Sequence, residues 1–348
     1  MKLERAKYGH MDKMPKDIEY FEGGMYDAVY EASCKWPHNT ALEYFDTQIT
    51  YKELIKKINR VAASLKALGA EKGERITICM PNTPEAIYMF YAINEIGAIA
   101  NMIHPLSAAK EIAFYLNFSK SKAILTLDQF YYKVASILPE LDNPCTILVA
   151  KVQDELPFPL KTLYPISKNA RAVKKLPASG YTLWTDMVRK GSNTALPEDS
   201  GKWDDCGAIL YSGGTTGTTK GIMLSNLNFN ALGLQTIAAS GFGSVAGMKM
   251  LSIMPVFHGF GLGVSIHTML VSGGCCILVP RFTPASYAKL LVKHRCNLVA
   301  GVPTLFDADG LNLIATRPDM KALFKPHHLI TPHPGEAARL LGRALEDP

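Results

Sequence analysis

The sequence predicts an α/β protein with two successive α/β subdomains, each containing a largely parallel sheet. Apolar runs of strand length alternate with longer segments of helical periodicity over residues 50–127, and this alternation returns over residues 206–302. An irregular stretch with several prolines and lysines, residues 151–202, separates the two series. The length of 348 residues is long for one hydrophobic core and sufficient for two.

The first series begins with a capping box, in which Thr50 and Glu53 satisfy the free backbone amides at the start of a helix. Apolar residues then follow helical spacing up to Gly69, which ends the helix. Strands are expected at 75–80, 98–104 and 122–127, and helices at 83–97 and 107–118. Because this order is βαβ, it favours a parallel sheet with helices on its faces. These elements predict a first subdomain over residues 1–150.

The second series has the same character. Strands are expected at 206–211, 249–254, 275–279 and 297–302, and helices at 227–239, 261–271 and 284–296. These elements predict a second subdomain over residues 203–306. Between the two subdomains, residues 151–202 are predicted to form a surface excursion with one short helix near Trp184.

One apolar segment, residues 260–280, is long enough to span a membrane. Gly273 and Gly274 interrupt it, however, and a β-rich run follows them. A buried helix, a turn and a buried strand therefore explain the segment better than a membrane span.

The composition excludes some classes of protein. Lys and Arg total 37 against 31 Asp and Glu, a net charge of +6, which suits a phosphate-bearing ligand but is too small to indicate nucleic-acid binding. The seven cysteines are odd in number and irregularly spaced, and most lie in apolar runs. We therefore expect reduced core cysteines in a cytoplasmic protein, with neither a disulfide framework nor a zinc site. The first residues are charged and do not resemble a secretory signal.

The strongest functional signal is the run 211–221, Tyr-Ser-Gly-Gly-Thr-Thr-Gly-Thr-Thr-Lys-Gly. Its glycines allow the backbone amides to approach a ligand, its hydroxyl groups can donate hydrogen bonds, and Lys220 adds a charge that suits phosphate. The run is not a Walker A loop, because Lys220 follows Thr219 and precedes Gly221. A flexible linker is the alternative, but linkers rarely lie between a buried strand and another apolar run. The segment is therefore predicted to bind a polyphosphate.

This run resembles the phosphate-binding signature of the adenylate-forming superfamily, which includes acyl-CoA synthetases, luciferases and nonribosomal adenylation domains. Other segments resemble family motifs and occur in the family's order: 50–54, 97–101 with Pro105, 254–258 and 301–304. The resemblance covers about residues 20–306. It implies the N-terminal domain of these enzymes, truncated in this chain.

The resemblance implies a reaction in two steps. A carboxylate attacks the α-phosphate of ATP in the presence of Mg²⁺, which releases pyrophosphate and leaves an acyl-adenylate. A thiol, usually that of CoA, then takes the acyl group. Positioning and charge neutralisation dominate the first step. The expected partners are therefore a small carboxylic acid, ATP and CoA, with neither nucleic acid nor a membrane span.

The resemblance also implies site residues. Lys220 and His258 are the catalytic candidates, since Lys220 would assist at the phosphates and His258 matches a family position near the acyl and adenylate site. A lone histidine after an apolar strand is equally compatible with a structural role, and His104 has less support than His258. No metal ligand is assigned. The residues expected to hold the nucleotide phosphates are Ser212, Gly213, Gly214, Thr215, Thr216, Gly217, Thr218 and Lys220.

The tail, residues 307–348, has a different character. Segments 307–315 and 329–342 resemble, in this order, the ribokinase-like NAD(P)H-hydrate dehydratase family, which would place His333 near a substrate. The motifs with which adenylate-forming enzymes contact adenine and ribose are not found after Phe306.

Three functions remain open at this point. The first is an acid-thiol ligase that activates a carboxylate with ATP. The second is a lyase that dehydrates hydrated NAD(P)H, inferred from the tail. The third is a nucleotide-binding fragment without enzymatic activity.

Overall fold

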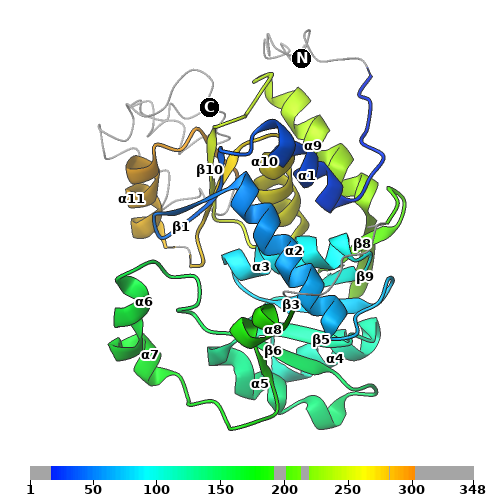
Figure 1. Ribbon diagram of the computed structural model, residues 1–348, viewed down its shortest axis with the longest axis vertical. Helices are drawn as coiled ribbons and strands as arrows, with labels where there is room; N and C mark the ends of the chain where they lie inside the picture. Colours follow the sequence, from blue (N-terminus) through cyan, green and yellow to red (C-terminus); the bar gives the residue numbers. More distant parts are fainter. Residues whose placement is uncertain (1–16, 192–200, 213–218, 282, 302–348) are drawn as a thin grey trace, which may run out of the picture.

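The computed structural model describes residues 17–191, 201–212, 219–281 and 283–301. Two mostly parallel sheets are packed with helices between them and outside them (Figure 1). The predicted α/β class with largely parallel sheets is therefore confirmed. All seven cysteines are free thiols. No helix within the described ranges is both long and apolar enough to cross a membrane.

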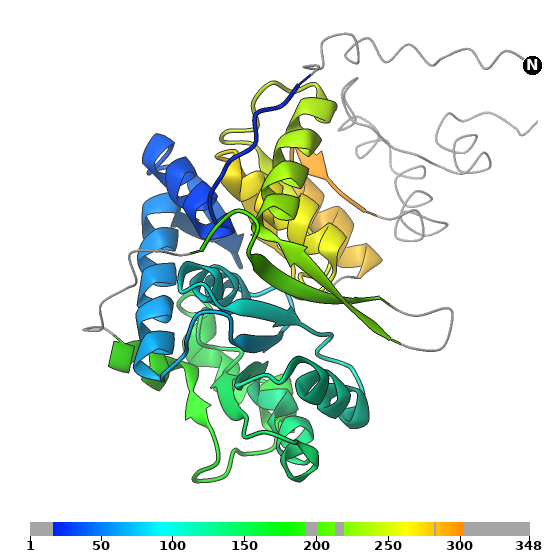
Figure 2. The same ribbon diagram turned by 90° about the vertical axis from the view of Figure 1, so that its right-hand side faces the viewer.

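The larger sheet has seven strands in the order β7-β6-β5-β3-β4-β8-β9. Neighbouring strands are parallel except for β8 and β9, which form an antiparallel pair at one edge of the sheet (Figure 2). The strands are β3 (Arg75–Cys79), β4 (Ile99–Met102), β5 (Ala123–Leu127), β6 (Thr146–Ala150), β7 (Thr182–Leu183), β8 (Cys206–Ser212) and β9 (Lys220–Ser225).

The smaller sheet has five strands in the order β12-β10-β11-β1-β2. Strands β1 and β2 form an antiparallel hairpin, whose turn places Phe45 and Asp46 at positive φ angles of 45° and 66°. The other pairs are parallel. The strands are β1 (Thr40–Tyr44), β2 (Thr47–Thr50), β10 (Lys249–Ser252), β11 (Cys275–Leu278) and β12 (Leu298–Val299).

The strands of the two sheets are interleaved along the chain. The hairpin β1–β2 joins the sheet formed by β10 to β12, and the pair β8–β9 joins the sheet formed by β3 to β7. Leu42 of β1 lies opposite Cys276 of β11, for example. The subdomain boundaries 1–150 and 203–306 stay a prediction. Hydrophobic patterns indicate the elements along the chain, but they do not indicate which sheet a strand will join.

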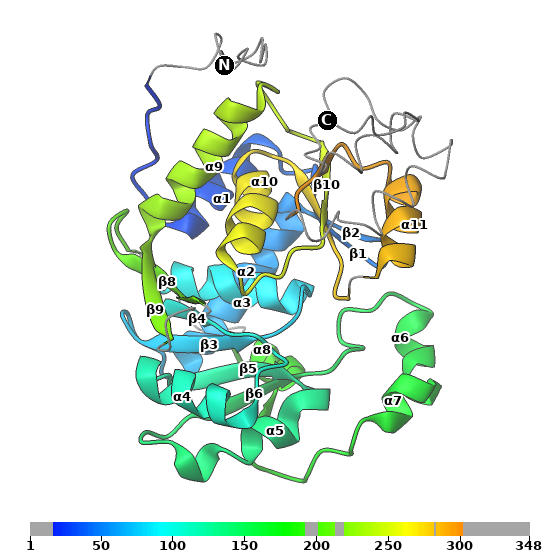
Figure 3. The ribbon, with the colours of Figure 1, turned by 180° about the vertical axis from the view of Figure 1, so that it is seen from behind.

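Helix α3 lies between the two sheets, and all twelve of its residues are buried (Figure 3). It packs against α1 and α2, whereas α4 and α5 lie on the opposite side of the larger sheet. The helices are α1 (Met25–Lys35), α2 (Tyr51–Ala67), α3 (Pro84–Glu95), α4 (Ala109–Ser119), α5 (Tyr131–Ala135), α6 (Leu160–Leu163), α7 (Lys168–Ala172), α8 (Trp184–Lys190), α9 (Asn226–Ser240), a π-helix (Phe260–His267), α10 (Thr268–Val271) and α11 (Pro284–His294), with short 3₁₀ turns at 128–130, 138–140 and 164–166.

Helix α2 was predicted from residues that are close in the sequence. Thr50 and Glu53 form the expected capping box, in which the Glu53 amide donates to Thr50 Oγ1 and the Thr50 amide donates to Glu53 Oε2. The prediction of a single short helix within 151–202 was wrong. Helices α6 and α7 accompany α8 there, and they are too short to show helical periodicity.

A buried chain of polar side chains joins three helical segments, α3, the π-helix and α9. The Tyr91 hydroxyl lies 3.0 Å from Nδ1 of His267, whose Nε2 lies 2.9 Å from Oδ1 of Asn230. Because the Asn230 oxygen accepts only, Nε2 of His267 carries the proton and Tyr91 donates to Nδ1. Burial lowers the pKa of His267 to about 3, so the ring is neutral. The predicted helix at 261–271 thus begins as a π-helix tied to α3 and α9.

Candidate functional site

The candidate site lies where parallel strands of the larger sheet end. Strand β4 lies between β3 and β8 in parallel register, so the carboxyl ends of the three strands lie at the same edge. The next residues along the chain carry Asn82 after β3, His104 after β4 and the glycine- and threonine-rich run after β8. Ligands of open α/β sheets bind at such carboxyl ends.

The structure describes only the two ends of the predicted phosphate-binding run, residues 211–212 and 219–221. Ser212 ends β8 and lies opposite Lys220, which begins β9, so the predicted loop joins the open end of an antiparallel pair. The Lys220 side chain is exposed. Gly213, Gly214, Thr215, Thr216, Gly217 and Thr218 lie outside the described residues, as does His333 of the tail, and their roles stay predictions.

Aromatic packing holds the β8–β9 pair at the base of this loop. The ring centroids of Tyr211 and Tyr115 are 4.3 Å apart, and the Tyr211 hydroxyl donates a 2.9 Å hydrogen bond to Oδ1 of buried Asn101. Gly221 lets the Phe118 ring approach β9 closely, because a Cβ there would lie 2.9 Å from that ring. Burial raises the pKa of Tyr211 to about 12, so it remains a neutral donor.

Asn82 connects the two sheets beside the site. Its side-chain amide donates to the carbonyl oxygens of Ser252 (3.0 Å) and Met254 (2.9 Å), and its Oδ1 accepts from the amide of Val256 (2.9 Å). Asn82 is 3% exposed, so no water competes for these bonds. The segment after β10, which leads to His258, is thereby fixed to the end of β3.

This connection brings the two candidate histidines together. The Phe257 ring contacts both of them, with its centroid 4.3 Å from that of His104 and 4.9 Å from that of His258. A Cβ on the next residue, Gly259, would lie 3.1 Å from Leu210 of β8. His258 is therefore close to the strand that leads into the predicted phosphate loop.

Both histidines are held neutral near physiological pH. Burial lowers the pKa of His258, and burial followed by the charges of His258 and Lys133 lowers the pKa of His104. Both side chains are nevertheless exposed at the edge of the sheet. The arrangement can therefore bind an anion through neutral hydrogen-bond donors.

The sequence analysis did not identify Asn82, Phe257 or Lys133 as members of this site. Phe257 stands inside a segment that resembles a family motif, so position alone could have indicated it. Asn82 lies between two prolines directly after a strand, which marks a turn at the carboxyl end of a sheet. Its partners are about 170 residues away, so its role could not be read from the chain.

Another group of ligand-type side chains lies on the smaller sheet. Glu43, Asp46 and His294 are near enough to hold a metal ion. Both oxygens of buried Glu43 are already occupied, however, since Oε1 lies 2.8 Å from His294 Nδ1 and Oε2 lies 3.1 Å from Lys249 Nζ. The group is best explained as an ion-pair network that joins β1, β10 and α11.

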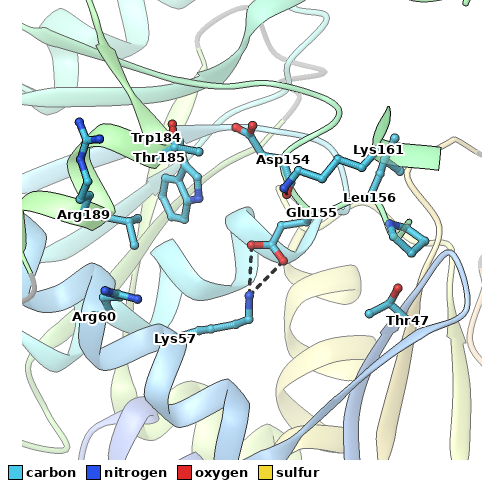
Figure 4. Close-up of a pocket in the computed structure, with 12 residues that line it drawn as sticks. Thr47, Lys57, Arg60, Asp154, Glu155, Leu156, Lys161, Trp184, Thr185 and Arg189 are labelled. Carbon is cyan, nitrogen blue, oxygen red and sulfur yellow. Dashed lines mark hydrogen bonds and ion pairs between the residues drawn. The ribbon is translucent and has the colours of Figure 1, made fainter. Parts of the chain in front are cut away.

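A cavity of about 480 Å³ opens between α2, α8 and the segment after β6 (Figure 4). Lys57 points to Glu155 within it, and the ion pair between them is 3.1 Å long. None of the predicted site residues lines this cavity. Its lining residues are Thr47, Lys57, Arg60, Asp154, Glu155, Leu156, Pro157, Lys161, Trp184, Thr185, Val188 and Arg189.

Glu85, in the first turn of α3, should make stability depend on pH. Burial, followed by the charge of Glu155, raises its pKa from 4.5 to about 8. Between these values the folded protein retains a proton that the unfolded chain has lost. The free energy of unfolding should therefore fall with rising pH by about 1.4 kcal/mol per unit for this group.

The variant Glu85→Gln should remove this contribution. Denaturation curves of the two proteins should nearly coincide near pH 5, and the variant should be more stable by a few kcal/mol near pH 8. Glu95, whose pKa burial also raises to about 8, titrates in both proteins and cancels in the comparison. A constant difference between the proteins across this range would contradict the prediction.

The described fold is that of an α/β protein in which the predicted phosphate-binding run, rich in glycine and threonine, follows a strand at the carboxyl edge of a mostly parallel sheet, where such sheets bind ligands. A family model described as AMP-binding enzyme matches residues 29–327. The chain therefore belongs to the AMP-binding enzyme family. The match runs past Phe306 and so includes residues 307–327 of the tail, and the dehydratase resemblance of the tail stays a prediction.

Curated relatives include the long-chain-fatty-acid–CoA ligase of Bacillus subtilis (strain 168), 28% identical over 296 residues that cover 84% of this chain and 52% of the relative. The feruloyl-CoA synthase of an Amycolatopsis species is 27% identical over 78% of this chain and 47% of its own length. This chain thus spans about half the length of the curated relatives it matches.

Solved structures support the fold. The anthranilate CoA ligase AuaEII in complex with anthranoyl-AMP superposes with a TM-score of 0.69 at 20% identity, covering 89% of this chain and 54% of that one. The N-terminal domain of FACL13 from Mycobacterium tuberculosis gives a TM-score of 0.69 at 20% identity, covering 92% and 73%. At this identity the likeness concerns the fold alone.

Proposed function

We propose that this chain provides the ATP- and acid-binding part of an acid-thiol ligase, which forms an acyl-adenylate and transfers the acyl group to CoA. The observation that carries the proposal is the position of the β8–β9 pair. The ends of its glycine- and threonine-rich loop lie at the edge where Asn82 and Phe257 bring His104 and His258 together. The ligase relatives match across this whole region.

Each residue of the site has a proposed role in binding ATP or the acid. The loop that Ser212 begins would hold the β- and γ-phosphates, with Lys220 adding positive charge. His104 and His258, as neutral groups, would face the carboxylate or the α-phosphate. Mg²⁺ would arrive on the phosphates of ATP, because the carboxylate–histidine group found among the described residues lies on the other sheet. The ion would neutralise phosphate charge in the first step.

The acid is proposed to be a fatty acid, since a relative matched over 84% of this chain is a long-chain-fatty-acid–CoA ligase. The test is ATP–pyrophosphate exchange with a series of fatty acids and one aromatic acid. Exchange that depends on a fatty acid is the expected result. ATP binding without exchange for any acid would instead favour a nucleotide-binding fragment.

The variant Gly217→Val should weaken ATP binding by at least tenfold, because a side chain would fill the space in which backbone amides meet phosphate. Gly217→Ala should give a smaller loss in the same direction. Calorimetric titration measures both, and the unfolding transition of each variant serves as the control for folding. Unchanged affinity in the valine variant would refute the phosphate-binding loop.

The ligase and dehydratase hypotheses differ in the role they give to His333 of the tail. The dehydratase resemblance of residues 307–348 would make His333 a substrate contact, whereas the ligase proposal assigns it no role. His333→Ala should therefore leave ATP–pyrophosphate exchange unchanged.

A further inference from the structure

We infer that His104 is a ligand-binding residue, which donates a hydrogen bond from Nε2–H of a neutral imidazole to an anionic oxygen of the bound substrate. The inference rests on the proposed function, since it concerns the same edge of the sheet. It assigns a defined tautomer and a defined role to a residue that the sequence supported only weakly.

The tautomer follows from one short hydrogen bond. The backbone amide of Leu106 donates to Nδ1 of His104 over 2.8 Å. A backbone amide is always a donor, so Nδ1 must offer its lone pair and cannot carry a proton. The single proton of the neutral ring therefore lies on Nε2. Protonation of the ring would place two N–H groups against each other and break this turn.

The turn that carries His104 is held from a neighbouring helix. Nζ of Lys133, in α5, donates to the carbonyl oxygens of Pro105 (2.7 Å) and Ser107 (2.8 Å). The amide of Ser107 in turn donates to the carbonyl oxygen of His104 over 3.1 Å. The imidazole also packs against the Phe257 ring at an interplanar angle of 45°. The ring is thus oriented before any ligand arrives, which lowers the entropic cost of binding.

The charges around the ring favour a neutral donor and an anionic partner. His258 and Lys133 act to lower the pKa of His104, and Glu111 acts to raise it, while burial has the largest effect and lowers it. Among the described residues Nε2 has no hydrogen-bond partner, and the side chain is exposed. An unpaired N–H beside Lys133 therefore points to a partner that brings negative charge.

The anionic oxygen has two sources in the proposed reaction, the carboxylate of the acid and a phosphate of the nucleotide. Both accept a hydrogen bond from a neutral N–H in the same way. The experiment therefore uses two probes separately, octanoate and AMP, and identifies the source by the probe whose affinity changes.

Two substitutions separate the two nitrogens of His104. His104→Asn places an amide oxygen near the Nδ1 position, which can still accept from Leu106, but it has no group at the Nε2 position. His104→Gln places an amide N–H near the Nε2 position but loses the local acceptor. If Nε2–H binds the ligand, the asparagine variant should lose roughly tenfold in affinity for one probe, and the glutamine variant should stay within about threefold of the wild type.

A ¹⁵N NMR spectrum of the unliganded protein near neutral pH checks the tautomer independently. The expected spectrum shows His104 protonated at Nε2 only, and addition of the responsive probe should shift that resonance. Protonation at Nδ1 would overturn the inference, as would an asparagine variant that binds both probes like the wild type or a glutamine variant that loses as much as the asparagine one. A wild-type protein that binds neither probe would instead overturn the proposed function itself, and the ligand role of His104 with it.

Discussion

Replacing Asn82 with aspartate is expected to lower the free energy of unfolding by about 3–5 kcal/mol. The substitution keeps the shape of the side chain but removes its donor group. A carboxylate oxygen would then face the carbonyl oxygens of Ser252 and Met254 in a site that is 3% exposed. Chemical denaturation at neutral pH measures the loss.

The matched control for this prediction is Asn39→Asp. The Asn39 side chain makes one long hydrogen bond, 3.3 Å to the carbonyl oxygen of Gly273, and it is only partly buried. Its replacement should cost about 1 kcal/mol. Equal losses for the two variants would show that Asn82 does not hold the segment after β10.

Replacing Gly261 with alanine is expected to destabilise the fold by at least about 3 kcal/mol. A Cβ at this position would lie within 2.1 Å of the carbonyl oxygen of Pro255, which is backbone and cannot rotate away. Alanine would gain at most about 1 kcal/mol over glycine as a helix former, so the steric effect decides the sign.

Gly259→Ala, two residues earlier, is the control for this second prediction. Its Cβ would meet only the tip of the Leu210 side chain, at 3.1 Å, and that group can move. We expect a loss below about 1 kcal/mol. Thermal unfolding of both variants gives the comparison, and a Gly261→Ala protein as stable as Gly259→Ala would contradict the close backbone approach.

The sequence could predict those parts of the fold that depend on neighbours along the chain. Helix α2 was predicted with its cap, because Thr50 and Glu53 interact across three residues. The hairpin β1–β2 was missed, because its turn places Phe45 and Asp46 at positive φ without the Asn-Gly or Asp-Gly pair that marks such turns.

The candidate site likewise has one part that the local sequence predicts and one part that depends on distant residues. The composition of residues 211–221 predicts phosphate binding from local chemistry, and this stays a prediction because residues 213–218 lie outside the described ranges. The proximity of His104 to His258 depends on Asn82, whose hydrogen bonds join residues 170 to 174 positions apart. No local pattern contains that information, because it arises only when the two sheets pack together.

The interleaved strands also constrain the order of events during protein synthesis. Tyr51 of α2 donates a hydrogen bond to Gly274, 223 residues later, and the neighbouring strand β1 pairs with β11 in the same region. A ribosome needs roughly 10–45 s to make that length of chain. Throughout this interval the apolar residues Ala41, Leu42 and Tyr44 lack the strand that finally pairs with them. We therefore expect the nascent β1–β2 hairpin to be accessible to chaperones that bind emerging chains.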